Sequence, residues 1–420
     1  MQDNEKKPAL RFKGFTDPWE QRKLGEICDF ITKGATPTTY GFSWQPDGVP
    51  FFRNDSIKDN VFVFGEFSYI SEAANEVLKR SEVHGNDILI AITGDIGKVG
   101  IIPDTVEKAN INQHIARVRI RKEALPYFVY QYLASDDMQK EYQKIKTGLS
   151  MPQLSLEQVR DIVVKIPEFN EQGKIADCLR RIDTLITLHQ RKHEKLVNIK
   201  KSMLDKMFPQ NGVSVPEIRF KGFTDPWEQR KLGDISEIKT GPFGSTLHAD
   251  DYVSDGIPII TTEHFKTGSL PIDKCGLPQV SENDFSRLSA YILNAGDIVF
   301  SRVGSVDINA LITPFQSTWL FSGRVLRVRP QNKNSSQFLH TLLETEDVKN
   351  DIRTRAVGQT MPSINTEILK TTPLRLPEST LEQEQLGKYF LNLDTLITLH
   401  QRKLEKLQNI KKSCLEKMFV

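Results

Sequence analysis

Loops rich in amide, hydroxyl, imidazole and guanidinium groups are the parts of this sequence that could do chemistry. Arginine can bind the edge of guanine through two hydrogen bonds, and asparagine or glutamine can bind adenine in the same way. Arg302 and Arg324 therefore suit guanine, whereas Asn54, Asn112 and Gln113 suit adenine. The chemistry that these side chains predict is recognition of base edges in a DNA groove.

The candidate DNA-contacting residues gather in loops of both halves of the chain. In the first half they are Lys33, Thr36, Thr38, Tyr40, Arg53, Asn54, Thr93, Lys98, Asn112, Gln113 and His114. In the second half they are Thr240, Ser245, Thr246, His248, Thr261, Thr262, His264, Arg302, Ser305 and Arg324. The alternative for each of them is ordinary solvation of a polar loop.

Motifs typical of enzymes are missing from the sequence. Gly94-Asp-Ile-Gly-Lys98 has the wrong spacing for a phosphate-binding loop, and Asp104 with Glu107 and Lys108 lacks the spacing of a nuclease site. There is no Asn-Pro-Pro-aromatic motif of adenine methylation and no Gly-x-Ser-x-Gly elbow. We therefore expect no catalytic site in this chain.

The four cysteines, Cys28, Cys178, Cys275 and Cys414, lie far apart and have no histidine at metal-binding spacing. This pattern argues against a zinc site and a disulfide framework, and it predicts buried free thiols. The longest apolar runs are strand-sized, and Met1–Lys7 is polar, so a soluble cytoplasmic protein is expected.

Length and charge limit the possible architectures and functions. The chain has 420 residues, of which 38% are hydrophobic and 26% charged, enough for two or three domains. Its 56 Lys and Arg against 54 Asp and Glu give a net charge of +2. Because so small a charge cannot clamp a long phosphate backbone, DNA binding would need local basic faces or the charge of a partner.

The sequence is a tandem repeat of about 210 residues. Residues 11–25 recur without change as residues 219–233, and residues 183–192 recur as residues 394–403. Between these blocks strand-like segments match, whereas the loops that follow them differ, as in Arg53-Asn54-Asp55 against Thr261-Thr262-Glu263. Similar strands with different loops predict two domains that share one fold and recognise two different targets.

A long helix is predicted at the end of each half, from about residue 171 to 208 in the first. Apolar residues recur every seven positions there, which is typical of a coiled-coil seam. The predicted seam residues are Ile175, Ile182, Leu185, His189, Leu196, Ile199 and Met203, then Leu386, Leu393, Leu396, His400, Leu407 and Ile410. We expect the two helices to pair antiparallel, with the histidines setting the register; the alternative is that each packs into its own domain.

The fold class predicted is α+β, with two tandem mixed α/β domains joined by the two helices and related by a pseudo-two-fold axis. Asp17-Pro18-Trp19-Glu20 has the residues of a helix start, so a short helix is predicted there and at Asp225. Further helices are predicted at residues 127–144 and 337–354. The predicted globular domains are residues 1–168, with conserved segment 11–25, and residues 211–379, with repeated segment 219–233. The predicted helical spacers are residues 169–210 and 380–420.

These features together identify a resemblance over essentially the whole chain. The sequence resembles the specificity (S) subunit of Type I restriction-modification systems in its repeated Gly-Phe-Thr-Asp-Pro-Trp-Glu-Gln-Arg-Lys-Leu-Gly block and its Gly-x-Pro strand starts. The Gly296-Asp-Ile segment and the closing Asp-Thr-Leu-Ile-Thr-Leu-His-Gln-Arg-Lys helices also match. The first half has Asn86 where the second has Gly296.

The resemblance implies that the chain is a non-catalytic subunit with two target-recognition domains, each reading one half of an asymmetric split DNA site. It also implies that the helical regions dock two methyltransferase subunits and restriction subunits, and so direct adenine methylation or cleavage. S-adenosylmethionine, ATP and magnesium would then be bound by those partners and not by this chain. The alternatives are a non-enzymatic coiled-coil scaffold for protein partners, or a stand-alone nuclease or methyltransferase.

Overall fold

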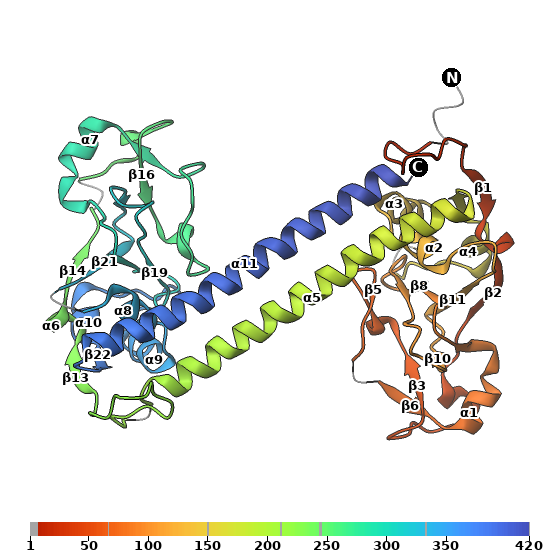
Figure 1. The fold of residues 1–420 in the computed structure, drawn as a ribbon, viewed down its shortest axis with the longest axis horizontal. Coiled ribbons are helices and arrows are strands. Elements are labelled where there is room, and N and C mark those ends of the chain that lie inside the picture. Colours follow the sequence, from red (N-terminus) through yellow and green to blue (C-terminus); the bar gives the residue numbers. More distant parts are fainter. Residues whose placement is uncertain are drawn as a thin grey trace. The chain divides into compact units, whose positions relative to one another are not determined.

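The computed structural model describes residues 7–65, 67–148, 151–210, 212–242, 246–331 and 334–419. The chain divides into two units, of which unit 1 is Met1–Gln190 with Arg402–Val420 and unit 2 is Arg191–Gln401 (Figure 1). Both units mix helix and sheet, as predicted. We call the part of unit 1 before residue 169 head 1, and the part of unit 2 from residue 212 to 379 head 2.

Head 1 contains two four-stranded sheets of short strands. The first has the order β2 (Cys28–Lys33), β11 (Ile115–Ile120), β8 (Ile88–Ala91) and β9 (Val99–Ile101), with antiparallel neighbours throughout. The second has the order β6 (Ser68–Ile70), β3 (Val49–Phe52), β10 (Ala109–Ile111) and β7 (Glu82–Val83), with β3 and β10 parallel. All four residues of β8 are buried, which explains its uninterrupted apolar sequence.

Smaller elements complete head 1. The pairs β1 (Glu20–Lys23) with β12 (Val163–Ile166) and β4 (Ile57–Lys58) with β5 (Val61–Phe62) are antiparallel. The helices are α1 (Glu72–Val77), α2 (Pro126–Leu133), α3 (Asp136–Ile145) and α4 (Leu156–Asp161), and the 3-10 turns are η2 (Leu24–Glu26), η3 (Pro37–Tyr40), η4 (Asn54–Ser56) and η5 (Lys79–Ser81). The helix predicted at residues 127–144 is thus two helices, because the Ser135 side chain caps α3 by accepting from Met138 N.

Head 2 repeats this design. One sheet has the order β14 (Ser236–Thr240), β21 (Val325–Pro330), β18 (Ile298–Ser301) and β19 (Asn309–Leu311), and the other β15 (Tyr252–Val253), β17 (Gln279–Val280), β16 (Ile257–Ile260) and β20 (Leu320–Phe321). The strands β13 (Glu228–Lys231) and β22 (Pro373–Leu376) form a separate pair. The helices are α6 (Leu232–Ile235), α7 (Glu282–Arg287), α8 (Ser336–Leu343), α9 (Glu346–Arg355) and α10 (Thr366–Lys370), with 3-10 turns η6 (Ala249–Asp251), η7 (Thr262–Phe265) and η8 (Ser289–Tyr291).

The short helices predicted at Asp17 and Asp225 are wrong, because strands β1 and β13 follow the Asp-Pro-Trp segments instead. β1 pairs along its whole length with β12, from Glu20 opposite Ile166 to Lys23 opposite Val163. The preceding Trp19 is 1% exposed and belongs to the core of unit 1. Cross-strand pairing and burial of the indole therefore outweigh the local helix-start signal.

The long helices are α5 (Phe169–Met207) and α11 (Thr380–Met418), each of 39 residues. Ion pairs with a buried glutamate fix the start of each helix to the repeated block of the same unit. Arg11 donates to both carboxylate oxygens of Glu171 at 2.8 and 2.6 Å, and Arg219 donates to those of Glu382 at 2.7 and 2.8 Å. Both glutamates are fully buried, so these pairs act as bidentate clamps within their units.

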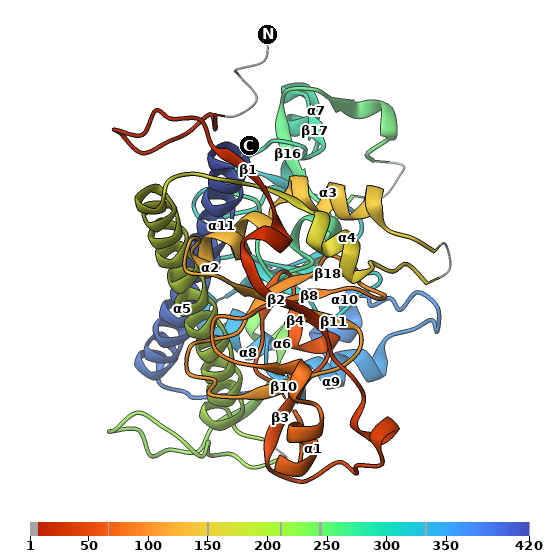
Figure 2. The ribbon, with the colours of Figure 1, turned by 90° about the vertical axis from the view of Figure 1, so that its right-hand side faces the viewer.

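The far end of each long helix lies in an aromatic socket of the unit that contains it. In unit 1, Phe419 follows α11 and its ring lies 5.5 Å from that of Phe128 and 6.2 Å from that of Trp19. In unit 2, Phe208 follows α5 and lies 5.7 Å from Trp227 and 5.9 Å from Phe338. Figures 1 and 2 both show the last turns of α11 beside α2 and the first part of α5 in unit 1. Burial of each phenylalanine contributes about 2 kcal/mol.

Backbone contacts at these ends also repeat. Leu10 N donates to Lys417 O at 2.8 Å in unit 1, and Ile218 N donates to Lys206 O at 2.9 Å in unit 2. Each head therefore begins beside the end of a long helix.

Within each unit a lysine of one long helix pairs with an aspartate of the other. In unit 1, Lys411 Nζ lies 2.8 Å from Asp183 Oδ1, and Asp183 also accepts from Tyr127 Oη at 2.6 Å. In unit 2, Lys200 Nζ lies 2.7 Å from Asp394 Oδ1 and 2.7 Å from Glu344 Oε2. Short segments of α5 and α11 are therefore in contact in both units.

The predicted seam residues fall into two groups. Ile175, Leu386 and Leu393 are buried, and Ile182, His189, Leu196, Ile199, Met203, His400 and Leu407 are half-buried. Leu185 and Leu396 are each 42% exposed and Ile410 is 40% exposed, which differs from the burial expected of seam residues. The residue after each of them, Ile186, Ile397 and Lys411, is half-buried instead. Ile186, Ile397 and Lys411 each lie four residues after a residue of the first row, which is one of the two steps in a 3.5-residue repeat, whereas Ile199 lies three residues after Leu196 and is also half-buried.

No helix in the described ranges is both long and apolar enough to cross a membrane.

Candidate nucleic-acid interface

The strand ends of head 1 converge on one edge of its sheets. β3 and β10 are parallel, with Phe52 opposite Ile111, so the loops that begin at Arg53 and Asn112 leave from neighbouring positions. The end of β8 at Ala91 lies opposite Ile115, and the end of β2 at Lys33 lies opposite Ala116. The loops after all four strands therefore meet at this edge, which we call the strand-end edge.

Hydrogen bonds connect several predicted residues across the strand-end edge. Thr36 Oγ1 donates to Gln113 Oε1 at 2.5 Å, and Gln113 Nε2 lies 3.1 Å from His114 Nε2. Asn54 Nδ2 donates to Thr93 O at 2.9 Å. The Asn54 Oδ1 atom is buried and accepts no hydrogen bond from the described residues. Hydrogen bonds thus join the four loops in two pairs at this edge.

Arg53 is held beside an exposed indole that the sequence analysis did not select. Its guanidinium carbon lies 4.9 Å from the centre of the Trp44 ring, and Arg53 Nη2 donates to Ser68 Oγ at 2.6 Å. Trp44 is 39% exposed and Tyr40 is 55% exposed. An aromatic residue in a polar loop was the only sequence signal for Trp44. Together these groups offer a cationic and aromatic surface that suits stacking on bases.

The remaining predicted residues of head 1 lie around the same loops. Lys33 and Thr38 are exposed, whereas Lys98 is half-buried and pairs with Asp95 at 2.6 Å. Asn112 uses its Oδ1 to accept from His114 N at 3.2 Å, so this amide shapes its own loop.

Head 2 has an equivalent strand-end edge with different side chains. β16 and β20 are parallel, with Ile260 opposite Phe321, and Ser322 N donates to Ile260 O at 2.9 Å. Thr261 N donates to His264 Nδ1 at 3.1 Å, and burial lowers the pKa of His264, so the neutral imidazole is favoured. Thr262 is half-buried, Ser305 is exposed after β18, and Thr240 Oγ1 is buried with no hydrogen-bond partner among the described residues.

Two predicted arginines of head 2 have unequal access to solvent. Arg302 is half-buried, and its Nη1 donates to Gly323 O at 3.0 Å. Its backbone is held on both sides, since Arg302 N donates to Arg324 O at 3.0 Å and Ile364 N donates to Arg302 O at 2.9 Å. Arg324 is exposed. The structure therefore gives Arg302 a role in fixing the loops and leaves Arg324 as the more accessible guanidinium.

Thr246 and His248 do not join the strand-end edge. They precede β15. The first residues of β15 and β16 both pair with Val280, so these two strands start at the same end of the sheet. Thr246 and His248 therefore lie near the start of β16, opposite the strand-end edge. There His248 N donates to Asp251 Oδ2 at 2.8 Å, and Arg287 pairs with Asp251 at 3.0 Å. The predicted residue Ser245 lies outside the described residues.

An ion pair with a buried aspartate closes the opposite end of each sheet, where β8 and β18 begin, and no sequence motif singled it out. Arg119 of β11 donates to both oxygens of Asp87 at 2.7 Å, and this hydrogen bonding raises the pKa of Arg119. Arg329 of β21 binds Asp297 in the same way, also at 2.7 Å. The aspartates are 2% and 1% exposed. Both pairs stand in matched positions of the repeat, which was the available signal.

The described ranges contain no group of three or more histidine, cysteine, aspartate or glutamate side chains that could hold a metal ion. All four cysteines are free. Cys28 is buried, and burial raises the pKa of its thiol to about 12, but Cys275 is exposed, contrary to the expectation of buried thiols. Both edges present hydrogen-bonding and charged groups, and the edge of head 1 also presents the rings of Tyr40 and Trp44.

Both halves of the chain are similar to a family of DNA specificity domains. A family model described as the Type I restriction modification DNA specificity domain matches residues 16–198 and again residues 224–409. The Type I restriction enzyme MjaVIII specificity subunit of Methanocaldococcus jannaschii is 23% identical over 412 residues, spanning 94% of this chain and 91% of the relative. The EcoBI specificity subunit of Escherichia coli is 30% identical over 165 residues, spanning 38% of this chain and 34% of the relative.

A solved structure shares the fold. The S subunit of a Type-I restriction-modification system from M. genitalium matches with a TM-score of 0.64 and 16% identity, and the match covers 99% of each chain.

Proposed function

Because the chain belongs to the Type I restriction-modification DNA specificity family, we propose that it is the DNA-recognition subunit of a Type I restriction-modification complex. Each head reads one half of a bipartite, asymmetric DNA target. The observation that carries this proposal is the repetition of one frame, including an Asp-Arg pair at the start of β8 and of β18, whose two strand-end edges present different side chains. A frame that is kept while its loops differ suits two modules that bind different half-sites.

The work of this chain is recognition, and catalysis belongs to its partners. Methyltransferase subunits would bind S-adenosylmethionine, and restriction subunits would bind ATP and magnesium. The net charge of +2 favours a phosphate clamp that is shared with those subunits, because affinity for the DNA backbone depends on the number of cations that neutralise phosphates.

The long helices are proposed to form an antiparallel coiled coil that sets the distance between the heads. Two ion pairs support this arrangement, Lys411 with Asp183 in unit 1 and Lys200 with Asp394 in unit 2. In both units a lysine near the end of one helix meets an aspartate near the start of the other, which is the relation that antiparallel helices produce.

Docking of two methyltransferase subunits is supported by an exposed face that is identical in both helices. Leu185 and Leu188 are 42% and 44% exposed, and their copies Leu396 and Leu399 are also 42% and 44% exposed. Large apolar side chains on a charged, exposed helix suit burial against a partner. Because the same pair occurs on each helix, one kind of partner surface would bind twice.

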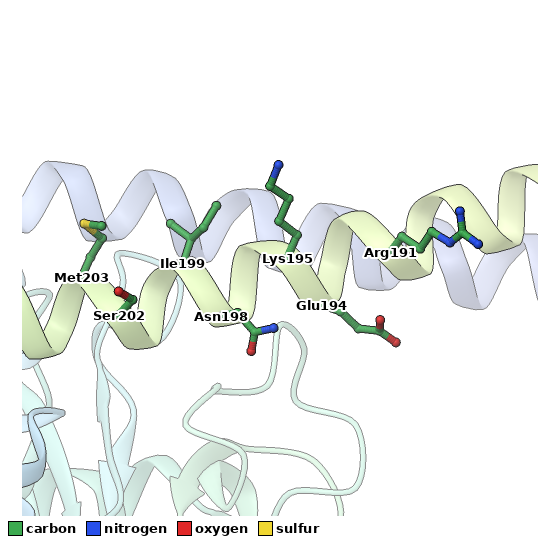
Figure 3. Close-up of a pocket in the computed structure, with 7 residues that line it drawn as sticks. All are labelled: Arg191, Glu194, Lys195, Asn198, Ile199, Ser202 and Met203. Carbon is green, nitrogen blue, oxygen red and sulfur yellow. The ribbon is translucent and has the colours of Figure 1, made fainter. Parts of the chain in front are cut away.

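Beyond these leucines the identical face continues into an open groove along α5. Seven residues of α5 line its volume of about 460 Å³, namely Arg191, Glu194, Lys195, Asn198, Ile199, Ser202 and Met203 (Figure 3). Lys195 and Ile199 point to one side of the helix, and Glu194 and Asn198 point to the other. All but Met203 have identical copies in α11, where Cys414 replaces the methionine.

A domain exchange tests the proposed function. Residues 26–147 are replaced by the equivalent segment of a relative, and the methylated motif is determined in cells that also express the partner subunits. We expect one half of the motif to change and the other to stay the same. An assembled complex without any sequence-specific DNA binding would instead favour a protein-binding scaffold, and a change in both halves would contradict independent heads.

A further inference from the structure

The same pair of backbone hydrogen bonds occurs once in each head, between α3 and α4 in head 1 and between α9 and α10 in head 2. In head 1, Thr147 N donates to Gln153 O at 2.9 Å and Gln153 N donates to Thr147 O at 2.8 Å. In head 2, Val357 and Ser363 exchange equivalent hydrogen bonds at 2.9 and 2.8 Å. Each loop contains a glycine followed three residues later by Met-Pro, Met151-Pro152 in one and Met361-Pro362 in the other.

The loop geometry fixes the position of each methionine backbone. Gly148 has a φ of +83° and Gly358 a φ of +101°, in the region that favours glycine. A Cβ atom at Gly148 would lie 2.6 Å from the Met151 carbonyl oxygen, and one at Gly358 would lie 2.9 Å from the Met361 carbonyl oxygen. The glycines are therefore needed to bring the methionine segment close to the start of the loop.

Both methionine side chains are exposed, which is unusual for a large apolar group. Met151 is 60% exposed and Met361 is 66% exposed. By contrast, Met138, Met207 and Met418 are 6%, 3% and 3% exposed. Neither head uses its loop methionine for its own core, although both heads retain it.

Backbone contacts join each loop to the strand-end edge. Gly94 N donates to Pro152 O at 3.3 Å, and Gly304 N donates to Pro362 O at 2.8 Å. Bridges also link Thr93 to Gln153 and Val303 to Ser363. The loops that follow β8 and β18, and which contribute predicted DNA-contacting residues, are therefore the loops that hold the methionine segments.

We propose that Met151 and Met361 each make an apolar contact with the duplex that does not depend on its sequence, packing the thioether against sugar and base-step surface. The inference rests on the proposed function. The side chains at the two strand-end edges differ, but the Gly-x-x-Met-Pro loop is the same in both heads, so it suits a feature that both half-sites share. A flexible, polarisable thioether adapts to such a surface, and apolar side chains contact DNA base steps in this way in other proteins.

Oxidation footprinting of the assembled complex tests the proposal without changing the protein. Hydrogen peroxide converts exposed methionines to sulfoxides, and mass spectrometry measures the rate at each position. The complex with its partner subunits is compared alone, with a cognate duplex and with a duplex of unrelated sequence. We expect both duplexes to slow oxidation of Met151 and Met361 several-fold, while Met138, Met207 and Met418 stay slow in all three states.

The outcomes of footprinting are distinct. Unchanged oxidation of both methionines in a complex that a mobility assay shows to be bound to DNA would overturn the inference and leave the proposed function intact. Protection that is already complete in the complex without DNA would overturn it in favour of a contact with a partner subunit. A complex that binds no duplex would overturn the proposed function and the inference with it.

Substitutions give a second measurement. M151A or M361A should weaken binding of the complex to cognate and unrelated duplexes by the same factor, about tenfold, which is the size expected from losing one apolar side-chain contact. M151L and M361L should keep most of the affinity, and all four variants should unfold at the parent temperature because the side chains are exposed. A loss restricted to the cognate duplex would assign base reading to the methionine and overturn the proposal.

Discussion

At the scale of single residues, the two arginines of head 2 separate a support from a candidate reader. Arg302 donates a guanidinium N–H to Gly323 O, whereas Arg324 is exposed at the same edge. Sequence alone selected both, because both follow matched strands. It could not rank them, since the ranking depends on a carbonyl contributed by a different loop.

Replacing these arginines should have different effects on DNA recognition. Arg324→Ala should lower discrimination at one base pair by about 1–3 kcal/mol if its fork reads guanine. Affinities of the assembled complex for cognate and single-mismatch duplexes measure this, with Arg324→Lys as the control that keeps the charge. Arg302→Ala should instead lower the unfolding temperature. Equal losses on all duplexes for Arg324→Ala would make it a phosphate contact.

A buried imidazole in head 2 gives a pH-dependent stability. His340 is 8% exposed, its Nδ1 lies 2.6 Å from Asn309 Oδ1, and burial lowers the pKa of His340. The carbonyl oxygen can only accept, so Nδ1 carries the proton of a neutral ring. Because the unfolded chain protonates a histidine below about pH 6.5 and the folded unit resists protonation, stability should fall as pH decreases from about 7.5 to 5.5.

Thermal unfolding across this pH range measures the effect. His340→Gln should reduce the slope of unfolding temperature against pH, since its amide can still donate to Asn309 and does not titrate. The neighbouring Glu344, Lys200 and Asp394 are present in both proteins, so the difference between the two slopes measures the titration of His340 together with its charge coupling to these groups. An identical slope in parent and variant would contradict the assignment to His340.

At the scale of elements, the long helices were the most predictable parts and the short ones the least. α5 begins at Phe169 and ends at Met207, against a predicted range of about 171 to 208, because an uninterrupted periodic segment defines its own limits. Strands β1 and β13 follow the Asp-Pro-Trp segments, and they could not be predicted locally because their partners, β12 and β22, lie more than a hundred residues away. The exposure of Leu185 could not be predicted because leucines occupy both the covered and the exposed side of α5.

The exposure of Leu185 gives a test of the two sides of the helix. Leu185→Asp should leave the unfolding temperature nearly unchanged, because this side chain is exposed, but should weaken binding of a methyltransferase subunit. Ile186→Asp should instead destabilise unit 1 by about 1–3 kcal/mol, because a carboxylate enters a partly buried position. Unfolding curves and native mass spectrometry of the assembled complex give the two readouts. Loss of stability in both variants would place Leu185 in the seam after all.

At the scale of the whole molecule, the repeat made the two-headed organisation predictable from sequence. The strand-end edges were predictable only in part, since parallel pairing of β3 with β10 and of β16 with β20 brings together loops that are distant in sequence. Trp44 beside Arg53 belongs to this unpredictable part. Thr246 and His248 were selected for their residue types and lie elsewhere because the strand order places them there.

The proposed spacer predicts the gap between half-sites. Inserting four residues after Gln190 and four after Gln401 lengthens each helix by about 6 Å and leaves the half-buried Lys200 and Lys411 pairs unchanged. Because the duplex rises about 3.4 Å per base pair, the non-specific gap should grow by one or two base pairs while both half-site sequences stay the same. The methylated motif of cells that express the variant with its partners reports both properties. An unchanged gap at full activity would show that the helices do not set the distance.

The backbone hydrogen bond from Leu10 to Lys417, repeated from Ile218 to Lys206, affects how the gene can evolve by recombination. Each head begins with an identical block, and the helix after it contains a segment, residues 183–208 or 394–419, that differs at only four positions. The clamp glutamates and the socket residues Phe128 and Phe338 lie between these repeated segments and occur in both halves. Recombination at the repeated segments would therefore exchange a whole head for one that carries the same kinds of attachment. A lineage could acquire a new DNA target in one genetic event, without passing through an intermediate that must evolve a new fold.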